Sequence, residues 1–139
     1  ALRRLVQELG LGSRVHFLGT RRDLPRLFRA MDLVVQPSLW EGLPLTLLMA
    51  MGAGLPVVGT RVSGTTDVVE DGRNGVLVAP GDSQALAHAI LELYRRPETC
   101  LRLGDAARRT VAEKHSQEAM LRRLEQIYLK ILEKKKSGR

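Results

Sequence analysis

One feature limits how this chain can fold more strongly than any other. Short apolar segments alternate with longer amphipathic segments along the sequence. Continuous apolar runs at residues 15–19, 33–36, 56–59 and 75–78 are typical of strands that are buried on both faces. Between and after these runs, apolar residues recur at helical spacing, as at Leu86, Ile90 and Leu93. The pattern therefore predicts an α/β fold with a Rossmann-like parallel sheet and flanking helices.

The two ends of the chain predict its organisation. Residues 1–5 have the character of a helix interior with no cap before it, so we expect the sheet to be truncated at its N-terminal side. Two C-terminal helices are expected at about 97–114 and 116–134, and the second carries an apolar stripe before it frays into lysines. We therefore assign residues 1–114 to a partial Rossmann-like domain and residues 115–139 to a C-terminal helix and basic tail.

Net charge and composition limit the classes of partner that the chain can bind. The formal net charge of +7 favours anionic ligands or surfaces. Aromatic residues make up 4% of the chain and do not alternate with basic ones, so no nucleic-acid partner is expected. The basic tail, Lys134, Lys135, Lys136 and Arg139, is expected to be solvated and mobile and to allow peripheral contact with an anionic membrane.

Cysteine content and hydropathy bear on the compartment. Cys100 is the only cysteine, so no internal disulfide can form, and a structural thiol in a reducing compartment is expected. No apolar run approaches the ~20 residues of a membrane span. These features favour a cytoplasmic location.

Ligands of open parallel sheets bind beyond the carboxyl ends of the strands. Three segments follow predicted strands at that edge: Gly19-Thr20, residues 37–44 and residues 59–66. The third contains the turn Ser63 to Thr66, where simple capping by Ser63 or Thr65 competes with a ligand contact. Because all three leave strand ends at one edge, we expect Glu41 to lie within ~15 Å of Gly64.

The strongest candidate site is the loop before the helix that starts near Pro44. The backbone amides of Gly42 and Leu43 lie just before that helix, where the dipole favours a diphosphate. Glu41 repels such a ligand, and two interpretations of this residue stay open. It accepts hydrogen bonds from sugar hydroxyls beside the diphosphate, or it stabilises the N-terminus of the helix.

Other polar residues carry a structural interpretation. The turn Asp71 to Gly75 is explained by positive φ at its glycines and at Asn74. No carboxylate or cysteine is spaced to form a metal site with His16, His88 or His115.

From Val15 to Pro80 the sequence resembles the C-terminal domain of the retaining glycosyltransferases of family 4, enzymes with two Rossmann-like domains (the GT-B fold). The order and spacing of the matching segments agree over about half of the chain. These segments are Val15–Gly19, Asp32–Ser38, Glu41–Pro44, Ala50–Thr60, Asp71–Gly75 and Pro80–Asp82.

The resemblance implies that the domain binds a nucleoside diphosphate sugar, the donor for retaining transfer of a hexosyl group to a hydroxyl acceptor. Neither a metal nor a cofactor is implied. Glu41 is implied to hold the hydroxyls of the donor sugar at the catalytic centre. The implied donor-binding positions are Gly19, Thr20, Gly42, Leu43, Leu45 and Met49, to which the strand-end argument adds Gly64 and Thr65.

The sequence departs from the family at Met49, where the second glutamate of the motif is implied to hold the ribose. We expect Met49 to face the nucleotide cleft, the alternative being a core position. The alternative function that Met49 favours is a degenerate, non-catalytic interaction domain. The resemblance implies that the acceptor domain and a pair of basic residues on the diphosphate lie upstream of Ala1, so this chain alone is not expected to transfer sugar.

The resemblance also predicts a rearrangement of the sheet. Residues 15–18 correspond to the third strand of the domain and residues 33–36 to the fourth, and these strands are not neighbours in the order 3-2-1-4-5-6. We expect the first of them to move in and pair in parallel with the second, which gives a four-stranded sheet, the alternative being aggregation or strand exchange with another copy.

Overall fold

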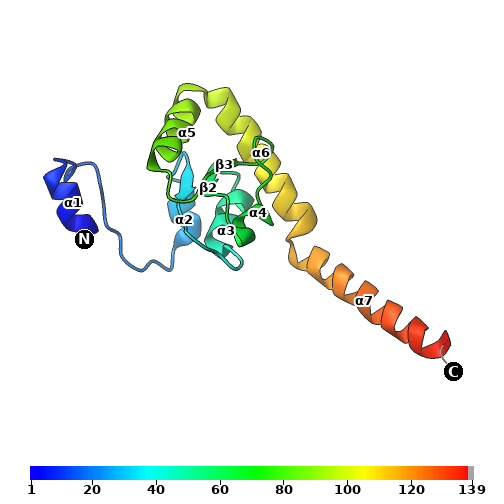
Figure 1. The fold of residues 1–139 in the computed structure, drawn as a ribbon. Coiled ribbons are helices and arrows are strands. Elements are labelled where there is room, and N and C mark those ends of the chain that lie inside the picture. Colours follow the sequence, from blue (N-terminus) through cyan, green and yellow to red (C-terminus); the bar gives the residue numbers. More distant parts are fainter. Residues whose placement is uncertain (138–139) are drawn as a thin grey trace.

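One parallel sheet lies between two layers of helices in the computed structural model, which describes residues 1–137 (Figure 1). The α/β fold expected from the sequence is confirmed. The strands are β1 (Val34–Gln36), β2 (Val57–Thr60) and β3 (Val76–Val78). The helices are α1 (Leu2–Glu8), α2 (Leu24–Phe28), α3 (Leu45–Gly52), α4 (Ser63–Thr66), α5 (Ser83–Arg95), α6 (Pro97–Lys114) and α7 (Gln117–Ser137).

The three strands lie side by side in chain order and run in parallel. Val35, Val58 and Val76 form one row across the sheet and pack in the core cluster that includes residues of α5. Val57 and Leu77 point to the opposite face and pack in the cluster that includes residues of α3. Both faces are therefore covered, as the uninterrupted apolar strands predicted.

Helix α6 approaches the chain after α3 so closely that only glycine fits at one position. A Cβ on Gly104 would lie 2.1 Å from the carbonyl oxygen of Gly54. Leu103 and Ala107, on either side of Gly104, are buried. This close contact fixes α6 against the region of α3, so the helix that carries the candidate loop has a rigid support.

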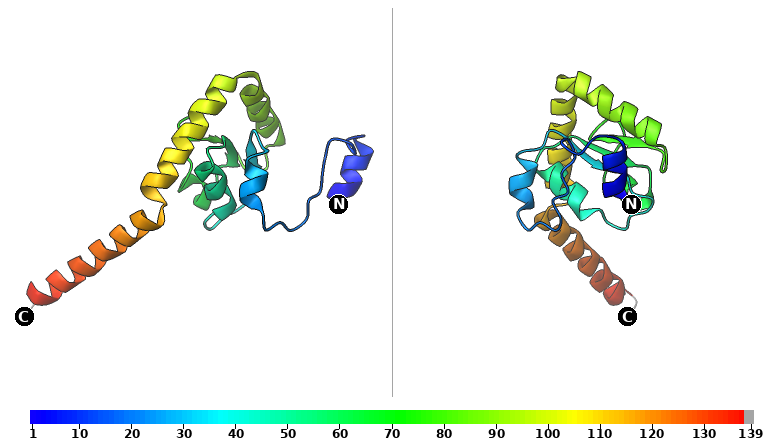
Figure 2. Two further views of the ribbon diagram at one scale, coloured as in Figure 1. Left: turned by 180° about the vertical axis from the view of Figure 1, so that it is seen from behind. Right: turned by 90° about the vertical axis from the view of Figure 1, so that its left-hand side faces the viewer.

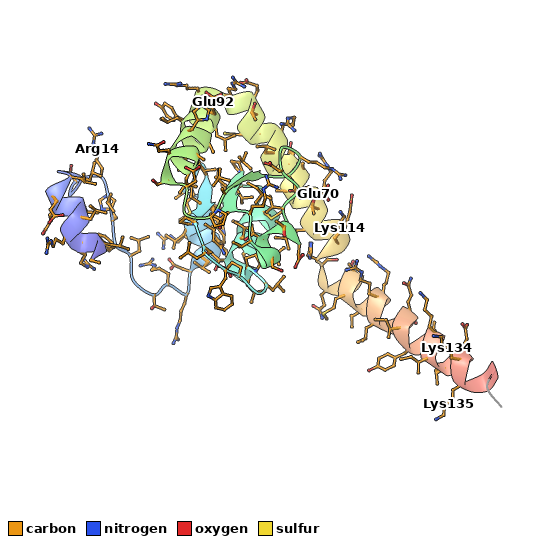
Figure 3. The ribbon with its side chains drawn as sticks, viewed as in Figure 1. Arg14, Glu70, Glu92, Lys114, Lys134 and Lys135 are labelled. Atoms are coloured by element: carbon orange, nitrogen blue, oxygen red, sulfur yellow. The ribbon has the colours of Figure 1, made fainter. Side chains whose placement is uncertain are left out.

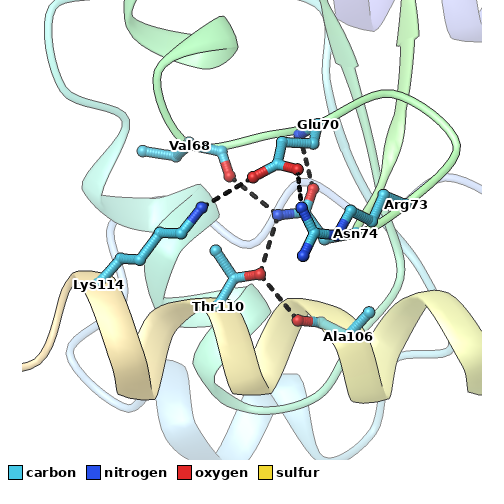
Figure 4. Close-up of polar contacts among 7 residues, drawn as sticks. All are labelled: Val68, Glu70, Arg73, Asn74, Ala106, Thr110 and Lys114. Carbon is cyan, nitrogen blue, oxygen red and sulfur yellow. Dashed lines mark hydrogen bonds and ion pairs between the residues drawn. The ribbon is translucent and has the colours of Figure 1, made fainter.

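A buried hydrogen-bond network joins the turn before β3 to α6 (Figure 4). Asn74 is fully buried, and its Oδ1 accepts a 2.7 Å hydrogen bond from the backbone N–H of Glu70. Its Nδ2 donates to the carbonyl oxygen of Val68 at 3.2 Å and to Oγ1 of Thr110 at 3.1 Å. Asn74 is thus the polar link between the turn and α6.

The explanation of the turn by positive φ is confirmed at Gly72 and wrong at Asn74 and Gly75. Gly72 has a φ of 74°, whereas Asn74 and Gly75 do not have positive φ. A Cβ at Gly75 would lie 2.7 Å from side-chain atoms of both Val57 and Val69. Close packing, rather than a left-handed backbone, therefore requires glycine at this position.

Glu70, whose backbone N–H binds Asn74, also forms two ion pairs. The Glu70 carboxylate accepts hydrogen bonds from Lys114, at 2.9 Å, and from Arg73 (Figure 4). The hydrogen bond from Lys114, followed by that from Arg73, lowers the pKa of Glu70. The side chains of both pairs are open to solvent, Glu70 at 41%, so these pairs add little stability compared with the buried amide.

The outer edge of β3 is covered by side chains. The outward-facing backbone N–H of Leu77 donates to Oδ1 of Asp71 at 2.9 Å. Nη2 of Arg61 lies 2.7 Å from Oδ2 of the same aspartate and donates to the carbonyl oxygen of Leu77 at 3.4 Å. The ion pair therefore occupies the hydrogen-bonding positions that a further strand would use.

The strand expected at residues 15–19 is absent, and so is its pairing with residues 33–36. These residues form an extended, exposed segment between α1 and α2, and α1 stands apart from the body of the domain (Figures 1 and 2). Phe17 is 40% exposed and contacts the guanidinium of Arg3. Among the described residues no strand lies beside this segment, so its backbone has no ladder to join.

Helix α7 projects from the body as a single long helix (Figures 1 and 2). It continues to Ser137, so the expected fraying at Lys134 does not occur. Lys134 and Lys135 are exposed (Figure 3), whereas Arg139 and the side chain of Lys136 lie outside the described part of the chain. No helix within residues 1–137 is long and apolar enough to cross a membrane.

Candidate functional site

The loop between β1 and α3 is held to the carboxyl end of the sheet. Thr60, the last residue of β2, is buried, and its hydroxyl donates a hydrogen bond to the carbonyl oxygen of Ser38. Pro44 precedes the first turn of α3, where its missing N–H costs nothing. The loop therefore lies where ligands of open parallel sheets bind.

The turn at α4 packs directly on this loop. The backbone N–H of Gly64 donates a 3.2 Å hydrogen bond to the carbonyl oxygen of Glu41. A Cβ on Gly64 would lie 1.8 Å from the carbonyl oxygen of Gly42, so only glycine allows this approach. The expected proximity of Glu41 and Gly64 is thus confirmed.

The capping explanation of the α4 turn is wrong. Val62 occupies the N-cap position of α4, and no side-chain hydrogen bond caps the helix. Thr65 is fully buried, and its Oγ1 has no hydrogen-bond partner. Its methyl carbon lies 2.8 Å from the position that a Cβ of Gly59 would take, so the side chain faces the sheet. A ligand role for the Thr65 side chain stays a prediction.

The Glu41 carboxylate is fixed by two donors. Nε2 of Gln36 and Oγ of Ser38 each donate a 2.6 Å hydrogen bond to its Oε1. All three side chains are partly buried. Glu41 therefore does not use its carboxylate to cap α3, which has no side-chain cap.

The residues that follow Glu41 present an open surface. A Cβ on Gly42 would meet no atom within 4 Å, and Leu43 and Leu45 are exposed. Met49 lies one turn after Leu45 and is 44% exposed, so its side chain is not part of the core. The backbone after Glu41 is therefore accessible to a ligand.

A small cavity of about 140 Å³ adjoins the same loop on the side of α5. Pro37, Leu39 and Leu86 are among its lining residues. Sites for whole small molecules usually measure ~300–1,000 Å³. This cavity alone is therefore too small for a ligand of nucleotide-sugar size.

Two of the predicted positions lie elsewhere. Gly19, with a φ of 64°, and Thr20 belong to the exposed segment before α2. No hydrogen bond among residues 1–137 joins either of them to the loop of Glu41. Their contact with a donor stays a prediction.

Sequence reasoning missed two residues that shape the site, Gln36 and Thr60. Each is a polar residue at the carboxyl end of an otherwise apolar strand. That position was the available signal, because parallel strands bring such residues to the ligand-binding edge.

The remaining titratable candidates lie outside this edge. Burial, followed by the charges of Arg123 and Lys114, lowers the pKa of His115 at the end of α6. Burial raises the pKa of Cys100, whose thiol donates to the carbonyl oxygen of Leu93 at 3.2 Å, which suits a structural thiol. Among the described residues no three His, Cys, Asp or Glu side chains form a group that could hold a metal ion.

A parallel sheet with helices on both faces, and glycine-containing strand-to-helix connections at its carboxyl edge, defines a Rossmann-like ligand-binding domain. Residues 1–96 match the family model described as glycosyl transferases group 1. The chain belongs to this family.

Individual relatives agree with this assignment. The chain is 34% identical over 135 residues to the N-acetyl-alpha-D-glucosaminyl L-malate synthase of Bacillus anthracis. The aligned region covers 97% of the chain and 35% of that protein. A crystal structure of Anabaena HepE in complex with UDP aligns with a TM-score of 0.88 and 31% identity over 93% of the chain and 36% of HepE. HepE in complex with UDP-glucose aligns with a TM-score of 0.77 and 36% identity over 81% of the chain and 31% of HepE. The chain thus spans about a third of the length of these proteins.

Proposed function

We propose that this chain is the donor-binding domain of a glycosyltransferase and that it binds a nucleoside diphosphate sugar. The observation that carries the proposal is the direct contact between the Glu41–Gly42 loop and Gly64 at the carboxyl edge of the sheet. Solved structures of HepE, a similar protein, contain UDP and UDP-glucose, which supports a donor of this class.

In the proposed complex, the diphosphate lies against the backbone amides of Gly42 and Leu43 and beside Leu45, whose own N–H donates to the carbonyl oxygen of Leu43 at 2.9 Å. The N-terminal end of α3 supplies a favourable dipole, which stabilises the charge that develops on the leaving diphosphate. Glu41 accepts hydrogen bonds from the sugar hydroxyls, because its carboxylate is held beside the open surface in front of Gly42.

The complete protein would transfer a hexosyl group with retained configuration to a hydroxyl acceptor. The acceptor site would belong to a further domain, so the isolated chain would bind the donor without transferring its sugar. The proposed location is cytoplasmic, with peripheral contact to anionic membranes through exposed lysines such as Lys134 and Lys135.

Titration of the chain with UDP-glucose, GDP-mannose and ADP-glucose, followed by NMR, tests this proposal. We expect one of the three to shift the amide resonances of Gly42, Leu43 and Gly64, and Glu41→Ala to weaken binding by about tenfold. Glu118→Ala, an exposed glutamate of α7, is the control and should leave binding unchanged. Resonances that none of the sugars moves would support the non-catalytic interaction domain instead.

A further inference from the structure

Two hydrogen-bond donors converge on a single oxygen of the Glu41 side chain. Nε2 of Gln36 and Oγ of Ser38 both lie 2.6 Å from Oε1. Within the described residues no hydrogen bond involves Oε2. The two oxygens of this carboxylate are therefore not equivalent, and Oε2 is the one left for a further donor.

The sheet, rather than the loop, fixes these two donors. Gln36 is the last residue of β1. Because side chains alternate along a strand, its side chain points away from that of Val35, to the face covered by α3. Gly59 lies opposite Gln36 on β2, and the methyl group of Thr65 packs over it. The carbonyl oxygen of Ser38 is bound by the Thr60 hydroxyl at the end of β2. Both donors are thus anchored to strands whose residues belong to the core.

A glutamate on an open loop normally samples several rotamers, and ordering it on binding costs conformational entropy. Here Oε1 is already bound and the carboxylate orientation is set before a ligand arrives. A side chain held in this way loses less entropy when Oε2 accepts a hydroxyl. The benefit applies only to ligands that reach Glu41.

We propose that Gln36 and Ser38 are positioning residues that orient the Glu41 carboxylate for the sugar of the donor, and so favour the nucleotide sugar over the free nucleotide. This inference rests on the proposed function. It adds a specific consequence, because the two residues affect binding of the sugar without affecting binding of the nucleotide.

The test compares the affinities of the chain for UDP-glucose and for UDP, measured by NMR titration. Gln36→Leu and Ser38→Ala remove the donors, and Ser38→Thr is the conservative control that retains the hydroxyl. We expect each removal to weaken UDP-glucose binding roughly threefold to tenfold with no change for UDP. In a Glu41→Ala background, Gln36→Leu should have no further effect on UDP-glucose binding.

Three outcomes overturn the positioning role: equal losses for the two ligands, no loss for either, or an unchanged effect of Gln36→Leu when Glu41 is absent. A wild-type chain that binds UDP-glucose no better than UDP, with no effect of Glu41→Ala, contradicts the proposed sugar contact of Glu41 instead. A ligand-free measurement separates the two failures. The side-chain amide resonance of Gln36 should shift on Glu41→Ala, and a resonance that does not move overturns the positioning role by itself.

Discussion

The backbone N–H of Gly64 donates a 3.2 Å hydrogen bond to the carbonyl oxygen of Glu41, and this bond joins two strand-to-helix connections that are far apart in the sequence. One connection follows β1 and the other follows β2. Because β1 and β2 are parallel neighbours, their carboxyl ends meet at one edge, and the contact fixes the geometry of that edge.

Gly64→Ala should therefore destabilise the fold. A Cβ at this position would lie 1.8 Å from a backbone oxygen of Gly42, so one of the two connections must move. We expect the free energy of unfolding, measured by urea denaturation, to fall by about 1–3 kcal/mol.

Gly42→Ala is the matched control, because it adds the same methyl group where no atom lies within 4 Å and where φ is not positive. It should leave the free energy of unfolding within about 0.5 kcal/mol of wild type. The added methyl group should reduce UDP-glucose binding, because it occupies space on the surface where the ligand is proposed to lie. Equal stability losses in the two variants would contradict the close contact between the connections.

Met49→Glu should tighten nucleotide binding without affecting the fold. The Met49 side chain is 44% exposed on α3, so a carboxylate there stays solvated and should change stability by less than about 0.5 kcal/mol. If the ribose lies beside this turn, the new carboxylate gains charge-assisted hydrogen bonds and should improve affinity about tenfold or more. Met49→Gln provides a neutral comparison, and unchanged or weaker binding of UDP by Met49→Glu would count against a weakened ribose contact at this position.

Asn74→Ala should be far more destabilising than the loss of a neighbouring ion pair. The substitution leaves the N–H of Glu70, the carbonyl of Val68 and the hydroxyl of Thr110 without their partner. We expect a loss of about 2–4 kcal/mol in urea denaturation, because buried polar groups without partners are costly. Arg73→Ala removes only an exposed pair with Glu70 and should cost less than about 1 kcal/mol. Similar losses in both variants would contradict this ranking.

Stability should decrease as the pH falls below the ordinary pKa of His115. Burial, followed by the charges of Arg123 and Lys114, lowers the pKa of His115 in the folded chain from 6.5. The unfolded chain therefore binds more protons between pH 6.5 and the folded pKa, and stability is lost as the pH drops through that interval. Urea denaturation at several pH values should show a smaller slope there for His115→Gln than for wild type. An identical slope would show that His115 is not responsible.

The sequence predicted the elements whose pattern is local. The apolar runs at 33–36, 56–59 and 75–78 became β1, β2 and β3, because each run lies beside another of the three. The run at 15–19 has the same local character but forms no strand, because strand hydrogen bonds depend on a partner that the run itself does not specify. Periodicity identifies residues that suit a strand, and only the neighbouring chain decides whether they pair.

The candidate site was predictable to the same extent. The proximity of Glu41 and Gly64 followed from parallel strand order, which brings successive strand ends together. The hydrogen bonds from Gln36 to Glu41 and from Thr60 to Ser38 were not predicted, because they depend on side-chain directions at strand ends. Likewise, spacing alone did not distinguish positive φ from burial at Asn74, since both conditions favour an asparagine in a turn.

The outer edge of β3 is covered by an ion pair. Asp71 accepts the outward N–H of Leu77 at 2.9 Å, and Arg61 donates to the Leu77 carbonyl at 3.4 Å, so the ion pair stands where another strand would bind. Because the pair is exposed, its removal should cost less than about 1 kcal/mol of stability, but it uncovers backbone groups that another copy can pair with. Asp71→Ala should therefore increase self-association, measured by sedimentation velocity over a range of concentrations. Asp71→Asn retains a side-chain oxygen that accepts from Leu77, so it should stay closer to wild type. If both variants self-associate equally, the charge rather than the hydrogen bond protects this edge, and if neither does, the pair has no protective role.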